Sequence, residues 1–278
     1  MFIFKKIADL KQFLHTQNGS IGFVPTMGAL HRGHLSLIEK AKQENSLTVC
    51  SIFVNPAQFN DKNDFEKYPM TLSSDIDLLS QVGADLLFLP SIDAIYPNGI
   101  DQLDDYNIGF LDTVLDGKFR PGHFKGVCNV IDRLLDAVAP SAMYMGEKDF
   151  QQCLVVKRLL ELKNSSVKLI TCPTRRETNG LAMSSRNELL SKGARERASA
   201  IYYCLKSIRD EMNKTPFSVL QDRYIRYLDS NSFETEYLLL ADAETLELMT
   251  DFNSSKKMVV LTASRLEGVR LIDNLRMN

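Results

Sequence analysis

Two histidines three residues apart are the feature of this sequence that points most directly to chemistry. They lie in the segment Val24-Pro-Thr-Met-Gly-Ala-Leu-His31-Arg-Gly-His34-Leu. Its pattern is typical of a strand, a turn and a helix that begins around Gly33 or His34. Because a helix N-terminus attracts anions, both imidazoles could face a phosphate group there. Surface histidines at a helix start are the alternative interpretation.

Two later segments also carry groups that bind anions, each before an expected helix. One contains Arg120 and His123, the last of the four histidines along the chain. The other follows a predicted strand over residues 142–145 and contains Lys148 and Gln152. Lys148 would be a point charge for a phosphate or carboxylate, and Gln152 a hydrogen-bonding group one turn later. A solvated helix residue is the alternative interpretation of Lys148.

A fourth segment, Met183-Ser184-Ser185-Arg186-Asn187, combines hydroxyls, backbone amides and an arginine in front of a helix. This combination suits a polyphosphate. Taken alone, the two serines could simply cap the helix. Four such segments, three of them after predicted parallel strands, favour a shared anion-binding site over four unrelated surface features.

The pattern of predicted strands and helices around these segments is typical of an α/β protein. Short apolar runs alternate with stretches of helical period, which predicts βαβ units and a buried parallel sheet. In such sheets ligands bind at the carboxyl ends of the strands. The last third differs, because two helices precede three strands, which predicts a small α+β domain. The predicted strands cover residues 21–24, 47–54, 85–89, 142–145, 167–171, 236–240, 258–263 and 269–272, and the two late helices cover residues 193–213 and 217–228.

Composition narrows the function classes. The chain has 278 residues, enough for one large or two modest domains, and its formal net charge of -2 gives no bulk attraction for nucleic acid or an anionic membrane. No run of 18 apolar residues and no signal-peptide core are present, so we expect a cytoplasmic protein. The five cysteines are widely spaced and lack a C-x-x-C pair. We therefore expect buried thiols rather than disulfides or a zinc site.

Six motifs together resemble one family over essentially the whole chain. They are P-T-M-G-A-L-H-x-G-H, S-I-F-V-N-P-x-Q-F, R-P-G-H-F-x-G-V, G-E-K-D-x-Q-Q, L-A-M-S-S-R-N and a C-terminal R-L-I-D-N. In this order they resemble the pantothenate synthetase (pantoate–β-alanine ligase) family. That family belongs to the nucleotidyltransferases with an H-x-G-H signature and a K-M-S-K-S-like loop. In this sequence M-S-S-R takes the place of the K-M-S-K-S-like loop.

The resemblance implies a fold and a reaction. The fold is α/β, with a Rossmann-like parallel-sheet domain over residues 1–175 that binds ATP and pantoate. The resemblance further implies a smaller α+β lid domain over residues 176–278 and a homodimer. Pantoate attacks the α-phosphorus of ATP and releases pyrophosphate; the β-alanine amine then attacks the pantoyl adenylate to give pantothenate and AMP. Mg2+ would accompany ATP, with few protein ligands.

The resemblance also implies roles for individual residues. Phosphate contacts and catalysis would come from His31, His34, Lys148, Ser184, Ser185 and Arg186. The rest of the ATP site would include Met27, Gly146, Asp149 and Met183. Pantoate and β-alanine would be bound by Gln58 and Gln152, in a pocket shaped by Pro25, Met27 and Phe59 and bordered by Asn55, Tyr68, Arg120 and His123.

Four positions depart from the pattern of the family: Met70, Ser74, Asp116 and Asn179. The Ser74 departure, where two successive acids are common, leaves a metal or subunit-contact role of that segment open. Two other functions would fit the His pair. An adenylyl- or cytidylyltransferase acting on a phosphorylated alcohol would have no need for two glutamines and R-P-G-H-F. A regulatory nucleotide-binding module would tolerate the loss of His34 or Lys148.

Overall fold

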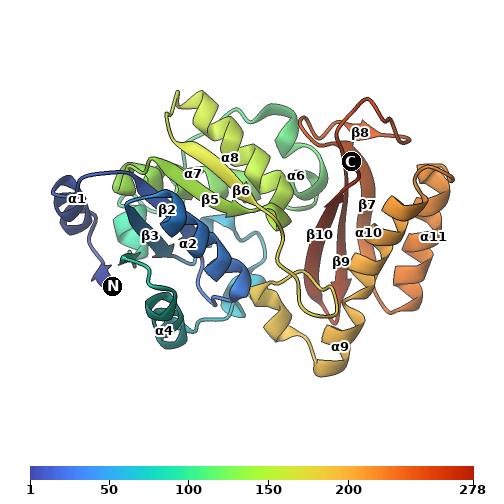
Figure 1. Cartoon of the computed structure of the whole chain (residues 1–278), viewed down its shortest axis with the longest axis horizontal. Coiled ribbons are helices and arrows are strands. Elements are labelled where there is room, and N and C mark those ends of the chain that lie inside the picture. The colour runs from blue at the N-terminus through green and yellow to red at the C-terminus, as the bar shows by residue number, and fades with distance from the viewer. The chain divides into compact units, whose positions relative to one another are not determined.

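The computed structural model describes residues 1–278 and separates into two compact units (Figure 1). The first contains Met1–Glu147 and Gln151–Pro173, and the second contains Lys148–Phe150 and Thr174–Asn278. The functional division into residues 1–175 and 176–278 remains a prediction. No helix is both long and apolar enough to cross a membrane.

A six-stranded parallel sheet forms the centre of the first unit, in the order β1-β4-β3-β2-β5-β6. All five strands predicted for this part are present, with ends that differ by no more than two residues. Only β1 was not predicted, because it has three residues, of which two are exposed, and it pairs at the sheet edge. The strands are β1 (Phe2–Phe4), β2 (Ile21–Thr26), β3 (Leu47–Ile52), β4 (Leu86–Phe88), β5 (Ala142–Gly146) and β6 (Lys168–Cys172).

Helices cover both faces of this sheet. Neighbouring residues of β2 show why, since Phe23 packs in a core cluster with α1, α7 and α8, while Val24 packs in another cluster with α2 and α4. A strand buried on both faces is apolar at successive positions. The helices are α1 (Ile7–His15), α2 (Arg32–Glu44), α3 (Lys62–Glu66), α4 (Leu72–Val82), α5 (Ile92–Ile95), α6 (Leu115–Phe119), α7 (His123–Val138) and α8 (Phe150–Leu162), with 3-10 turns η1 (Pro56–Gln58), η2 (Gly109–Asp112) and η3 (Glu147–Asp149).

The strand order reverses at β2. From β2 the chain passes to β3 on one side, and it later returns to β5 on the other. Ligands of open α/β sheets bind beside such a reversal, at the carboxyl ends of the strands. The segment containing His31 and His34 leaves the sheet at this end of β2.

An antiparallel sheet in the order β10-β9-β7-β8 and three helices form most of the second unit. The predicted α/β fold with a smaller α+β part is confirmed. The predicted helix over residues 193–213 is wrong in one respect, because it is two helices that meet at Ser199, whose hydroxyl donates to the Glu196 carbonyl at 2.7 Å. The elements are η4 (Ser185–Leu189), α9 (Lys192–Arg197), α10 (Ala200–Glu211), α11 (Phe217–Ser230), β7 (Glu234–Asp242), β8 (Leu248–Met249), β9 (Met258–Leu266) and β10 (Val269–Arg276).

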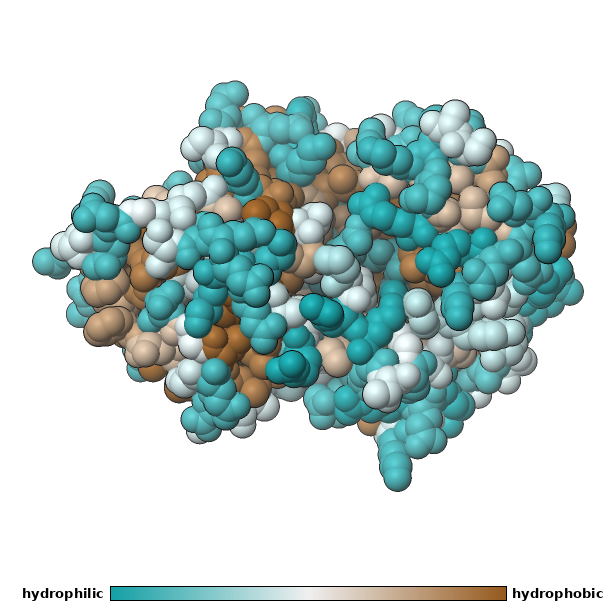
Figure 2. Space-filling view, viewed as in Figure 1, coloured by the Kyte–Doolittle hydropathy of each residue, from teal (hydrophilic) through white to brown (hydrophobic).

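The cysteines and the surface agree with the composition. All five cysteines are buried free thiols, as predicted. Burial raises the pKa of Cys50, Cys128 and Cys204 to about 12 in each case, so these thiols are poor nucleophiles at neutral pH. Figure 2 shows hydrophilic residues over much of the visible surface, interrupted by apolar patches.

Candidate functional site

The two histidines of the H-x-G-H segment cap α2 reciprocally. His31 is the N-cap, and its Nδ1 accepts a hydrogen bond from the Gly33 amide at 3.1 Å. His34 Nδ1 accepts from the His31 amide at 3.4 Å, and the ring centroids lie 4.0 Å apart. The helix begins at Arg32, slightly earlier than predicted.

This capping determines which ring nitrogen of each histidine carries the proton. A ring nitrogen that accepts a hydrogen bond carries no proton, so each neutral imidazole holds its proton on Nε2. The first turn of α2 contains no acidic residue. The positive helix end is therefore not neutralised from within the helix, and two Nε2–H donors accompany it.

A buried carboxylate holds the loop that leads to these histidines. Asp75 of α4 is 1% exposed, and its two oxygens accept from the amides of Ala29 at 3.0 Å and Leu30 at 2.8 Å. Gly28 and Ala29 both have positive φ, and a Cβ added at Gly28 would lie 3.1 Å from an Asp75 oxygen. The segment with the Ser74 departure thus has a defined role in the structure, which is to position the loop through Asp75.

Replacement of Asp75 by Asn should therefore destabilise the protein. The new amide group would face a backbone N–H that has lost its acceptor, at a cost of about 1–3 kcal/mol in the free energy of unfolding. Urea unfolding measures this cost, with Asp77→Asn as the matched control because Asp77 lies exposed on the same helix. Equal stability of the two variants would contradict the role given to Asp75.

The Gln58 carboxamide is oriented by its neighbours in the first unit. Its Oε1 accepts from Asn55 Nδ2 at 3.2 Å, and its Nε2 lies 2.9 Å from the Met27 sulfur. Asn55 is 1% exposed and also binds the Gly126 carbonyl, the Ala57 amide and the Tyr96 hydroxyl. All the hydrogen-bonding positions of Asn55 are thus used inside the protein, which gives it a positioning role.

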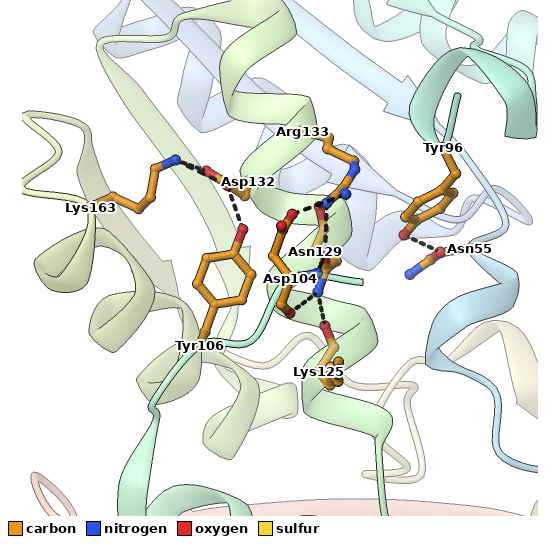
Figure 3. Close-up of polar contacts among 9 residues, drawn as sticks. All are labelled: Asn55, Tyr96, Asp104, Tyr106, Lys125, Asn129, Asp132, Arg133 and Lys163. Atoms are coloured by element: carbon orange, nitrogen blue, oxygen red, sulfur yellow. Dashed lines mark hydrogen bonds and ion pairs between the residues drawn. The ribbon is translucent and has the colours of Figure 1, made fainter. Parts of the chain in front are cut away.

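Polar contacts along α7 support this part of the site (Figure 3). Tyr96 donates to Asn55 Oδ1 at 2.7 Å, and burial raises the pKa of Tyr96 to about 12, so the hydroxyl stays a donor. Asn129 exchanges hydrogen bonds with the backbone of Asp104, and Arg133 pairs with the Asp104 carboxylate at 3.1 Å. These contacts fix the segment after α5 against α7, the helix that begins with His123.

His123 joins α7 to the Gln58 backbone. Its Nδ1 lies 2.8 Å from the Gln58 carbonyl and must therefore carry the proton, which leaves Nε2 to accept from Arg120 at 3.1 Å. His123 is 5% exposed. Gly126, one turn later, permits close approach, because an added Cβ would lie 2.2 Å from the Ala57 carbonyl oxygen.

Other predicted pocket residues lie in the same unit. Phe59 follows η1, and its ring packs edge-on against Tyr68 with centroids 5.7 Å apart. Pro25 lies in β2 and Gly146 ends β5. Gln152 lies half-buried in the first turn of α8.

Gln151, which was not predicted to matter, is the better connected of the two glutamines. It is 4% exposed, donates to the carbonyls of Leu111 and Val114, and accepts from the Asp116 amide. It therefore clamps the segment that leads to Arg120. Cys153 is buried, and its sulfur lies 3.5 Å from the Gly146 carbonyl oxygen, in agreement with a structural thiol.

The remaining predicted ATP residues belong to the second unit. Lys148 is mostly buried, and its ammonium lies 3.6 Å from an Asp149 carboxylate oxygen. Ser184, which follows Met183, caps η4 by accepting from the Arg186 amide at 3.3 Å, and Ser185 is buried. Capping and anion binding are compatible, because the cap uses a lone pair of the Ser184 hydroxyl, whereas an anion would accept from its O–H.

Two of the departures from the family pattern can be placed precisely. The Asn179 side chain accepts from the Leu181 amide at 3.1 Å, a contact that an Asp oxygen would also make. Met70 is 83% exposed and therefore contributes little to the core.

Among the positioning residues, only Asp75 carries a sequence signal that could have revealed it. It shares the apolar face of α4 with Leu79, four residues later, and a carboxylate on such a face implies a buried partner. Nothing in the sequence distinguishes Gln151 from Gln152 or connects Tyr96 to Asn55. The structure contains no group of three or more His, Cys, Asp or Glu side chains that could hold a metal ion.

Comparisons with known proteins agree over the full length. The family model for pantoate-beta-alanine ligase matches residues 2–276. Pantothenate synthetase of Cytophaga hutchinsonii is 45% identical over 262 residues, covering 93% of this chain and 92% of that protein. The corresponding protein of Azobacteroides pseudotrichonymphae is 44% identical over 280 residues, covering 99% of each.

Solved structures give the same result. The crystal structure of pantothenate synthetase from Thermus thermophilus has a TM-score of 0.91 at 38% identity, covering 100% of this chain and 99% of that chain. Pantoate-beta-alanine ligase from Francisella tularensis, complexed with beta-gamma ATP and beta-alanine, has a TM-score of 0.85 at 37% identity, covering 100% of this chain and 98% of that chain.

Proposed function

The chain belongs to the pantoate-beta-alanine ligase family, and from this premise we propose how its residues make pantothenate. The enzyme condenses pantoate with β-alanine at the expense of ATP. We propose a pantoyl adenylate intermediate, formed when a pantoate carboxylate oxygen attacks the α-phosphorus of ATP and pyrophosphate leaves. The β-alanine amine then attacks the acyl carbon, and AMP leaves with that oxygen.

The observation that carries this mechanism is the reciprocal cap of His31 and His34 beside the reversal of strand order. Transfer at phosphorus needs mainly positioning and donors where negative charge develops. Two Nε2–H groups at a helix N-terminus whose first turn contains no acidic residue meet this need. We propose that Lys148, Ser184, Ser185 and Arg186 add charge and hydrogen bonds to the same phosphates, while Met27, Gly146, Asp149 and Met183 border the nucleoside.

The pantoate pocket is proposed around Gln58 and Gln152. A neutral carboxamide can orient a carboxylate without the strong charge pairing that would reduce its nucleophilicity. The contacts from Asn55 and Met27 hold Gln58 in one rotamer before substrate arrives. Pro25, Phe59, Tyr68, Arg120 and His123 complete the proposed pocket.

Mg2+ is proposed to enter with ATP as part of the substrate, where it neutralises triphosphate charge. Such ions usually keep several waters and need few protein ligands. A homodimer and a cytoplasmic location, expected from the sequence, remain predictions. Sedimentation of the purified protein would measure the oligomeric state.

Isotope exchange tests the proposed mechanism. Labelled pyrophosphate should enter ATP when enzyme, Mg2+ and pantoate are present and β-alanine is absent. A concerted ligase would need all substrates, a transferase acting on a phosphorylated alcohol would not need pantoate, and a regulatory module would give no exchange. In the complete reaction, one 18O atom of the pantoate carboxylate should appear in AMP while the other stays in the amide carbonyl of pantothenate. Label in inorganic phosphate or pyrophosphate instead of AMP would exclude the adenylate.

Gln152→Ala should weaken pantoate binding much more than ATP binding. A polar site that loses one partner leaves the other unpaired, at about 1–3 kcal/mol, or roughly 5- to 150-fold in affinity. Calorimetry with each ligand separately measures this difference. Gln151→Ala is the comparison at the neighbouring position. It should lower the stability of the protein, because it removes the hydrogen bonds to the Leu111 and Val114 carbonyls. Equal weakening of both ligands by Gln152→Ala would show that this residue does not select pantoate.

A further inference from the structure

The C-terminal R-L-I-D-N motif has no role in the mechanism above, yet its last residue contacts the segment that carries Lys148. The Asn274 carboxamide of β10 donates to the Lys148 carbonyl at 2.9 Å, and Asn274 is 5% exposed. Both residues belong to the second unit. A buried amide–carbonyl hydrogen bond of this length restrains the peptide plane that follows Lys148, and so restrains the backbone segment from which the side chain extends.

A second contact from the same strand supports this one. Arg276 lies over the ring of Phe150, with its guanidinium carbon 5.1 Å from the ring centroid. Residues two apart in a strand point to the same side, so Asn274 and Arg276 both face Lys148–Phe150. These three residues group with the second unit although they lie between Glu147 and Gln151 in the chain.

Asn274 is itself held in place by the preceding residue. The backbone N–H of Asn274 donates to Asp273 Oδ1 at 2.8 Å. Arg176 binds both oxygens of the Asp273 carboxylate, at 2.6 and 3.0 Å, and donates to the Asn274 carbonyl at 3.3 Å. A bidentate pair of this kind is geometrically restrictive, and Asp273 is only 3% exposed.

Arg176 extends the same support to the serine loop. It donates to the Gly180 carbonyl at 3.2 Å and stacks on Tyr202, with its guanidinium carbon 3.9 Å from the ring centroid. An isolated antiparallel bridge joins Arg176 to Ala182, two residues before Ser184. One buried network therefore anchors both segments of the second unit that carry proposed phosphate ligands.

We propose that Asn274 is a positioning residue that places the Lys148 ammonium for transfer at the α-phosphorus, with the Arg176–Asp273 pair holding Asn274 in register. This inference rests on the proposed role of Lys148. Asn274 acts through the Lys148 backbone, and the ammonium supplies the charge.

Asn274→Ala should lower kcat for pantoate-dependent pyrophosphate exchange by up to about 100-fold, the loss that a misplacement near 1 Å can cause. The KM for pantoate should stay unchanged. Gln221→Ala is the matched control, since it removes a carboxamide–carbonyl bond of 2.7 Å to Leu238 in the same unit and should leave kcat unchanged. Thermal unfolding of both variants measures the loss of stability that they share.

A double-mutant cycle separates positioning from general support. If Asn274 works through Lys148, then Asn274→Ala should cause no further loss of kcat in the Lys148→Ala enzyme. The same fold-loss in both backgrounds, or wild-type kcat in the single variant, would overturn the inference. If the alanine variant does not fold, Asn274→Asp, of equal size, replaces it. This substitution places a carboxylate oxygen against the Lys148 carbonyl. Wild-type kcat in the Asn274→Asp enzyme would also overturn the inference. Wild-type enzyme without pantoate-dependent exchange would instead contradict the proposed function.

Discussion

His34→Ala is expected to lower turnover at saturating substrates by roughly 10²- to 10³-fold, the loss found when one preorganised donor to a developing negative charge is removed. The reason is specific to this geometry. His34 Nδ1 is occupied by the His31 amide, so the Nε2–H is the donor that a phosphate would meet. Single-turnover formation of the adenylate measures the effect on the chemical step directly.

The same substitution also removes a helix-capping contact, which alone would cost about 1 kcal/mol of stability. His34→Gln separates the two effects. Glutamine at the third helical position can accept from the N-cap amide, as in an ordinary capping box, but it lacks the imidazole Nε2–H. We expect the Gln variant to recover stability and stay slow. Because a glutamine carboxamide keeps an N–H donor, recovery of turnover together with stability would show that the imidazole itself is not required.

The parallel sheet could be predicted because its strands are buried on both faces. Phe23 and Val24 point to opposite clusters, so β2 reads as a continuous apolar run with no helical period. β1 lacks this signal, since Phe2 is 62% exposed at the sheet edge. The break at Ser199 was missed because it lacks the Pro or Gly that usually marks a helix end; a bond from the Ser199 hydroxyl to the Glu196 carbonyl accompanies it.

The proposed ligands carry signals that their supporting residues lack. His31 and His34 stand out because their type and spacing suit an anion at a helix start. Asn55, Tyr96 and Asn274 act through contacts with residues remote in the sequence: 41 positions separate Tyr96 from Asn55, and 126 separate Asn274 from Lys148. Such pairs follow from the sheet topology, which local patterns do not encode.

Lys148→Ala is the second substitution expected to cost roughly 10²- to 10³-fold in turnover, because it removes a mostly buried cation from the proposed phosphate site. Lys148→Met gives the sharper test, since methionine is also long and unbranched but carries no charge. Both variants should be slow to a similar degree if charge is what matters. Lys157→Ala, at an exposed position of α8, the next helix along the chain, should turn over like the wild type.

Lys148→Arg tests whether catalysis needs the compact ammonium of lysine or only a positive charge at this position. The planar guanidinium of arginine is larger and distributes its donors in a fixed fork, so it should restore ATP binding more than turnover. Because Asn274 restrains the Lys148 backbone, we expect the longer arginine side chain to place its charge differently from the lysine ammonium. Fast turnover in Lys148→Met would exclude a charge role, whereas full turnover in Lys148→Arg would show that charge suffices and that the positioning by Asn274 is not needed for catalysis.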